Sequence, residues 1–159
     1  MARIPVFFSF HYANDVMRVQ QIRNIGVLEK NEPLSPNDWE QLKRTGETSV
    51  KHWIDENMKH KRCVIVLVGA ETAKRPFVRY EIEKAWNDGK GLFGIYIHNL
   101  RCPRNSTSAI GQNPFNNFTI ENGTKMSSVI HCYNPSTYNE IAQNMESWVN
   151  LAIAEAQRR

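Results

Sequence analysis

One carboxylate in this sequence falls where a hydrophobic side chain is expected. Residues 75–86, RPFVRYEIEKAW, have the spacing of an amphipathic helix, in which each residue turns by about 100° and one face is apolar. The apolar side chains of that face are Phe77, Val78, Ile82 and Ala85. Glu81 falls among them, whereas Glu83 falls on the solvent side. Glu81 therefore either bends out to solvent from the rim of the apolar face or is held in a cleft for chemistry.

A second group of chemically useful residues follows the first apolar segment, at positions 9–12. Ser9 offers a hydroxyl and His11 an imidazole at the end of a predicted strand. Phe10 and Tyr12 add aromatic faces, which stack on flat bases such as adenine or nicotinamide. Structural roles are the alternatives: core packing for Phe10, a surface loop position for His11 and a backbone hydrogen bond for Ser9.

The elements that must position these residues alternate between strand and helix. Five apolar segments have the composition of β-strands: residues 4–10, 26–29, 63–68, 91–97 and 128–133. Helical spacing occurs over residues 14–23, 48–58, 75–86 and 136–157, with a short helical turn through Trp39. We therefore expect an α/β fold with an open, mostly parallel five-stranded sheet and helices on both faces. Ligands of such sheets bind beyond the carboxyl ends of the strands, near a topological switch point, so Ser9 and Glu81 are expected to face one crevice.

Composition restricts the classes of function. The 159 residues suffice for one domain with a core, so we expect a single domain over residues 1–159. A net charge of +4 suits an anionic ligand, but no run of Lys and Arg is dense enough for a nucleic-acid partner. With no stretch of about 18 apolar residues and no signal-peptide pattern, we expect no membrane partner and a cytoplasmic location. The three cysteines form no metal-binding spacing, so no metal is expected. No resident cofactor is expected either.

Several known uses of such a fold require motifs that this chain lacks. A P-loop needs glycines followed by Lys and Ser or Thr, and a Rossmann site needs three spaced glycines after the first strand. FSFHYAND stands there instead. A phospho-accepting receiver needs an aspartate at the end of the central strand, where this chain reads CVIVLVGAET. These classes of nucleotide-binding and phosphotransfer sites are therefore not expected.

Four sequence blocks resemble the TIR-like proteins of bacterial Thoeris antiphage defence. They are VFFSFHYAND (6–15), NDWEQLKRTG (37–46), VIVLVGAETAKRPFVRYEIEKA (64–85) and GQNPFNNF (111–118). The resemblance implies a flavodoxin-like TIR fold and cleavage of NAD at the nicotinamide–ribose bond, with a helix glutamate as the catalytic residue. The glutamate that matches this position is Glu81. Phe77 stands where the family commonly has tryptophan, and keeps an aromatic wall for the substrate.

The resemblance also concerns the long segment at 99–126. Asn113 begins an Asn-Pro-Phe sequence that matches a turn of the family, and Pro114 restricts Asn113 to an extended conformation. We expect this turn to close the long segment over the crevice, and we count Asn113 among the substrate-binding residues with Ser9, Phe10, His11, Tyr12 and Phe77. Trp39 is expected to serve packing, with pocket lining as the alternative. Lys74 and Arg75 are expected to be solvated cations, with attraction of a pyrophosphate as the alternative.

The function implied by the resemblance is that of a signalling enzyme. NAD would be its substrate, and a cyclic or conjugated ADP-ribose would be the messenger that activates a separate effector protein. A phage-derived trigger and a homo-oligomer remain open as partners. Two alternatives from other classes are a nucleoside deoxyribosyltransferase-like enzyme and a non-catalytic TIR interaction module in which Glu81 only shapes an assembly surface.

Overall fold

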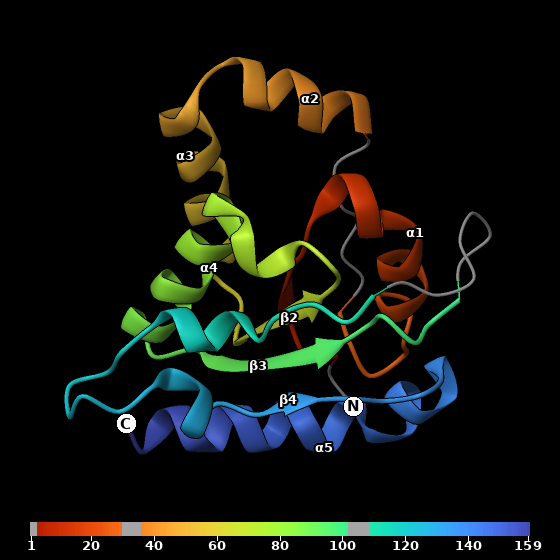
Figure 1. The fold of residues 1–159 in the computed structure, drawn as a ribbon, viewed down its shortest axis with the longest axis vertical. Coiled ribbons are helices and arrows are strands. Elements are labelled where there is room, and N and C mark those ends of the chain that lie inside the picture. Colours follow the sequence, from red (N-terminus) through yellow and green to blue (C-terminus); the bar gives the residue numbers. More distant parts are fainter. Residues whose placement is uncertain (1–2, 30–35, 102–108) are drawn as a thin grey trace.

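A parallel sheet, with four strands among the described residues, forms the centre of the molecule (Figure 1). The computed structural model describes residues 3–29, 36–101 and 109–159. The strands lie in the order β1 (Val6–Ser9), β2 (Cys63–Val68), β3 (Gly91–Tyr96) and β4 (Cys132–Tyr133), and every neighbouring pair is parallel. β2 is buried at all positions, which is the environment expected for a run of β-branched residues in a sheet covered on both sides. The predicted fold class is confirmed.

The number of strands was predicted wrongly, because the segment 26–29 forms no strand. Its only ladder contact is a single parallel bridge between Ile4 and Leu28. The preceding residues turn tightly, with the Leu28 N–H donating to the Ile25 carbonyl, so too little extended chain remains for a ladder. Leu28 is nevertheless buried beside β1, on the side opposite β2. Counted with this bridge, the order of segments is that of a flavodoxin-like sheet.

The described helices cover both faces of the sheet. They are α1 (Tyr12–Ile22), α2 (Pro36–Arg44), α3 (Glu47–Met58), α4 (Pro76–Asn87) and α5 (Tyr138–Gln157). α1 and α5 pack on one face, and α3 and α4 pack on the other, where Figure 1 shows them together and away from α5. α2 packs against α3. The sheet is therefore the middle of three layers, and its two faces have separate hydrophobic cores.

Short 3-10 helices fill the connections after β2 and β3. η1 (Thr72–Lys74) joins β2 to α4, whereas η2 (Pro114–Asn117) and η3 (Met126–Ser128) lie in the predicted long segment. The last strand is shorter than predicted because η3 and the turn after it occupy residues 126–130. η1 and η2 pack against each other beside the carboxyl end of β2, whereas η3 leads into the start of β4.

Candidate active site

The inward position of Glu81 is fixed by the local folding of α4. Pro76 is the first helical residue, and the extended Arg75 before it provides the backbone that a proline requires. The helix ends before Gly89, which adopts the left-handed φ of 70° that favours glycine. The buried residues of α4 are Val78, Glu81, Ile82 and Ala85. Glu81 thus belongs to the buried face and does not bend out to solvent.

Glu81 meets the end of β1. The Ser9 hydroxyl donates a hydrogen bond to Glu81 Oε1 at 2.6 Å. Ser9 is fully buried, and Glu81 is 8% exposed. Ser9 is the last residue of β1, and α4 packs against β1, β2 and β3, so the bond connects a strand end to a neighbouring helix. The carboxyl group is therefore held in place at the carboxyl end of the sheet.

Burial dominates the protonation of this carboxyl. It raises the pKa of Glu81 to about 8, because a charge is poorly solvated among the apolar residues of α4 and the sheet. The hydrogen bond from Ser9 opposes this effect, since it stabilises the charged form. At neutral pH the group is consequently a mixture dominated by the neutral acid. Strongly shifted pKa values are concentrated among groups that carry out chemistry, and Glu81 combines such a shift with a position beside the end of β1.

The position coincides with the topological switch point of the sheet. After β1 the chain crosses to the Leu28 bridge on one side and later to β2 on the other. The connections that leave β1 and β2 therefore diverge, and ligands of open α/β sheets bind in the crevice between such connections. His11 follows β1, and Gly69 follows β2.

The residues after Ser9 have different surroundings. His11 is half-buried, and burial lowers the pKa of its imidazole, with the positive charge of Arg75 adding to the effect. Lys43 also lowers this pKa and Glu71 raises it, so charges from several elements face His11. Phe10 packs partly buried against the core formed with α1 and α5, on the other face of the sheet from α4. Tyr12 begins α1, but its side chain lies outside the described part of the molecule.

An aromatic wall lies one helical turn from Glu81. Phe77 is half-buried and meets Trp39 of α2 edge-to-face, with ring centroids 6.3 Å apart. Trp39 in turn meets Trp53 of α3 at 6.3 Å. Trp39 was expected to serve packing, and these contacts fulfil that role while placing it beside Phe77. The proximity of Trp39 to the Glu81 face of α4 was not predicted, because the sequence does not reveal where α2 docks.

Asn113 shapes a turn beside the site. Its Oδ1 accepts a hydrogen bond from the Phe115 N–H at 2.9 Å, which caps η2. Phe115 is fully buried under the sheet face covered by α4. Asn117 Nδ2 donates to the Ala73 carbonyl of η1 at 3.2 Å, so the turn lies against the connection between β2 and α4. The side-chain oxygen of Asn113 is thus engaged in the turn.

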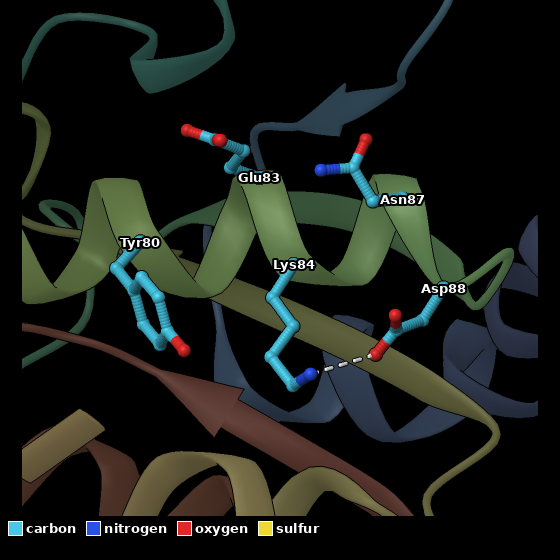
Figure 2. Close-up of a pocket in the computed structure, with 5 residues that line it drawn as sticks. All are labelled: Tyr80, Glu83, Lys84, Asn87 and Asp88. Atoms are coloured by element: carbon cyan, nitrogen blue, oxygen red, sulfur yellow. Dashed lines mark ion pairs between the residues drawn. The ribbon is translucent and has the colours of Figure 1, made fainter. Parts of the chain in front are cut away.

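A surface pocket of about 210 Å³ lies on α4, but Glu81 does not line it (Figure 2). Its lining residues are Tyr80, Glu83, Lys84, Asn87 and Asp88. Two of its polar groups are engaged with neighbours: Lys84 Nζ lies 3.1 Å from Asp88, and the Tyr80 hydroxyl donates to Asp55 of α3 at 2.6 Å. This pocket is therefore a solvated part of the helix surface and not the candidate active site.

Within 3–29, 36–101 and 109–159, no three His, Cys, Asp or Glu side chains gather as metal ligands. In the same ranges no helix has the length and apolar character to cross a membrane.

Comparisons with known proteins agree on one family. The family model described as "Thoeris protein ThsB, TIR-like domain" matches residues 7–102. The chain is also 33% identical over 115 residues to a protein of Bacillus cereus (strain MSX-D12) named "Putative cyclic ADP-D-ribose synthase ThsB1". That match covers 69% of this chain and 60% of the relative, so the chain spans less than two thirds of the relative's length. The residues matched by the family model include Ser9, Phe77 and Glu81, and the match ends before Asn113.

Proposed function

Because this chain belongs to the family of the Thoeris protein ThsB with its TIR-like domain, we propose that it is an enzyme that cleaves NAD and releases a cyclic or conjugated ADP-ribose as a signal. The observation that carries the proposal is the buried carboxyl of Glu81, held by Ser9 at the switch point of the sheet. The name of the Bacillus cereus relative, "Putative cyclic ADP-D-ribose synthase ThsB1", supports the same kind of reaction.

The chemical step requires stabilisation of positive charge. When the bond between nicotinamide and ribose breaks, an oxocarbenium-like centre develops on the sugar. A fixed carboxylate in a partly dry site stabilises that charge, and its oxygens accept hydrogen bonds from ribose hydroxyls. Nicotinamide leaves as a neutral molecule, so the step needs no general acid. Glu81 supplies the carboxylate in this proposal and need not form a covalent bond with the sugar.

Substrate binding itself favours the reactive form of Glu81. Without substrate, burial keeps the pKa of Glu81 near 8. NAD carries a positive charge on its pyridinium ring, and a positive charge nearby lowers the pKa of a carboxyl group. The attraction increases as the ribose becomes cationic, so it stabilises the transition state more than the bound substrate, which is the requirement for catalysis.

The surrounding residues divide the remaining tasks. Ser9 positions the Glu81 carboxyl through its hydroxyl. Phe77, with Trp39 beside it, offers an aromatic wall for a flat base. The positive charges of Lys43 and Arg75 are close enough to lower the pKa of His11. We therefore assign the negatively charged diphosphate to the side of the site where His11 lies. Asn113 contributes by holding the turn at η2.

The proposal assigns different roles to Phe10 and Tyr12. Phe10 packs on the opposite face of the sheet, and we assign it to the core beneath the site. Tyr12 remains a proposed substrate-binding residue from the sequence. The enzyme would act in the cytoplasm, through a messenger-activated effector. A phage-derived trigger and self-assembly are the proposed means of control.

The group that attacks the ribose cation decides the product. Attack by water gives ADP-ribose, whereas attack by a hydroxyl or a base nitrogen of the same molecule, with loss of its proton, gives a cyclic ADP-ribose, which is lighter than ADP-ribose by one water. We favour the cyclic or conjugated product because the relative is named for a cyclic one.

The test compares nucleotides in cells. Cells that carry the gene, its Glu81→Gln variant or no gene are infected with phage and extracted, and the extracts are analysed by mass spectrometry. The proposal predicts loss of NAD and a new ADP-ribose derivative only with the unaltered gene. Extracts with a changed deoxynucleoside pattern and intact NAD would instead support a deoxyribosyltransferase. Protection from phage with unchanged nucleotides would support a non-catalytic module.

A further inference from the structure

A second buried ionic group lies near the candidate site and has no part in the chemistry above. Asp15 and Arg18 of α1 are each 2% exposed, and Arg18 Nη1 lies 3.5 Å from Asp15 Oδ1. Removing two charges from water is costly, and a buried ion pair often stabilises a protein less than apolar residues of the same size. Within the described residues, Asp15 Oδ2 and Arg18 Nη2 have no hydrogen-bond partner. The pair is therefore poorly explained by stability alone.

The pair lies in the first turns of α1, directly after β1, and its side chains contact the connections that follow β2 and β3. The backbone N–H of Asp15 donates to the carbonyl of His11, the N-cap residue of α1, at 3.0 Å, as is usual at the start of a helix. The Asp15 carboxylate lies against the Cα of Gly69, after β2, where a Cβ would collide with all three atoms of the carboxylate. Arg18 Nε donates to the Leu100 carbonyl at 2.8 Å, after β3. The side chains of the first turns of α1 thus contact two further chain segments at the carboxyl edge of the sheet.

A chain of contacts connects Gly69 with the helix that carries Glu81. The Gly69 N–H donates to Thr72 Oγ1 at 2.8 Å, and Thr72 is buried at the start of η1. η1 leads into α4, the helix that carries Glu81. Gly111 of the long segment rests on the Gly69 carbonyl, where a Cβ would also collide. A displacement of Gly69 would therefore be passed to η1 and to the turn beside it.

We propose that the buried Asp15–Arg18 pair is a positioning element of the candidate active site, which ties the first turn of α1, directly after β1, to the connections after β2 and β3 and thereby fixes Glu81 of α4 against Ser9 of β1. The inference rests on the proposed function for its catalytic consequence, but its structural part is separate. Neither residue touches the substrate in this proposal; both act through Gly69 and Leu100. A misplacement of about 1 Å at a catalytic group can reduce a rate about 100-fold, so the clamp matters more for turnover than for stability.

The test replaces the pair with apolar residues of similar size. Asp15→Leu combined with Arg18→Met leaves no unpaired buried charge, so the protein is expected to fold and to melt at the same or a higher temperature. Gly69→Ala introduces the Cβ that displaces the Asp15 carboxylate. Gly26→Ala is the matched control, because a Cβ there meets nothing within 4 Å.

Two measurements decide the inference. Nicotinamide release from NAD should show kcat reduced about 10-fold or more in both test variants, with KM changed less than about threefold and Gly26→Ala unchanged. Titration of the Glu81 carboxyl by NMR should show a pKa nearer the ordinary value of glutamate than the value of about 8 in the unaltered protein, because water entering the loosened site relieves the burial that raises this pKa, and this effect is larger than that of losing the Ser9 hydrogen bond. Unchanged kcat and an unchanged Glu81 titration in folded variants would overturn the inference. If the unaltered protein releases no nicotinamide even in an extract of phage-infected cells, the proposed function fails, and the titration alone still decides whether the pair positions Glu81.

Discussion

Glu81 is an ionisable group in a position that an apolar residue would occupy at lower cost. It shares the buried face of α4 with Val78, Ile82 and Ala85, and it has one hydrogen-bond donor, Ser9. A shift of its pKa from 4.5 to about 8 corresponds to roughly 5 kcal/mol of disfavoured ionisation, at 1.36 kcal/mol per pKa unit. Residues that reduce stability in this way are concentrated where function requires them.

The stability of the protein should therefore depend on pH through Glu81. Below the ordinary pKa of 4.5 the group is neutral in both the folded and the unfolded chain, and its burial carries no ionic penalty. As the pH rises from 4.5 to about 8, the unfolded chain loses its proton first, so the free energy of unfolding falls. Glu81→Gln removes this titration. We expect the variant to melt several degrees above the unaltered protein at pH 8, with a smaller difference at pH 5.

The control for that experiment is Glu83→Gln on the exposed face of α4. Asp15, whose pKa burial raises to about 6, titrates in all three proteins and so cancels from the comparison. Equal pH dependence in the two variants would contradict the burial of Glu81.

Catalysis should depend on the same ionisation. If the carboxylate is the reactive form, kcat/KM for NAD rises about tenfold per pH unit below pH 8 and levels off above it, because kcat/KM reports the free enzyme. Ser9→Ala should move this midpoint upward, since the Ser9 hydroxyl lowers the pKa of Glu81. Rates measured from pH 6 to 9 check both statements. A flat profile, or a downward shift in Ser9→Ala, would speak against the assigned roles.

At the scale of elements, the helices and strands that depend on local interactions were predicted correctly from the sequence. α4 was predicted from its own spacing, and CVIVLV from its composition, because both segments bury the faces that their sequences specify. The segment 26–29 was predicted as a strand from apolar composition, but turn hydrogen bonds before it left only the Leu28 bridge. Local apolar character did not distinguish a strand from a single buried bridge.

The same distinction explains the candidate site. The inward position of Glu81 follows from the spacing of one helix, whereas its bond to Ser9 joins residues 72 positions apart and depends on how α4 docks on β1. The pairing of Trp39 with Phe77 and the clamp from Asp15 to Gly69 are also long-range. The latter two contacts leave no periodic pattern in the sequence and were not predicted, whereas the expected topology of the sheet had already placed Ser9 and Glu81 at one crevice.

The docking of α2 provides a prediction at this scale. Trp39 is the residue through which α2 meets both Phe77 and Trp53. Trp39→Ala should raise KM for NAD about 10-fold or more, since loss of aromatic stacking on a base costs roughly 1–3 kcal/mol. Trp148→Ala is the matched control, because Trp148 of α5 stacks on Tyr133 on the face of the sheet opposite to α3 and α4. Both variants should lose stability, but only Trp39→Ala should change KM; equal KM values would confine Trp39 to packing.

At the scale of the whole molecule, the sheet separates two cores and joins them at one edge. α1 and α5 form one core, and α3 and α4 the other. Ser9 from β1 and Glu81 from α4 meet at the carboxyl edge, where Asp15 from the opposite layer reaches Gly69. The site therefore depends on correct assembly of all three layers, although its central carboxyl belongs to one helix.

The central claim is that Glu81 carries the cleavage of NAD, and nicotinamide release tests it most directly. The measurement compares the unaltered protein with Glu81→Gln and Glu83→Gln, each shown by circular dichroism to be folded, under conditions in which the unaltered protein is active. We predict that Glu81→Gln lowers the rate by at least about 100-fold, as expected for removal of the main charge stabilising a transition state, and that Glu83→Gln keeps the full rate. Nicotinamide release by folded Glu81→Gln at the rate of the unaltered protein would contradict the claim.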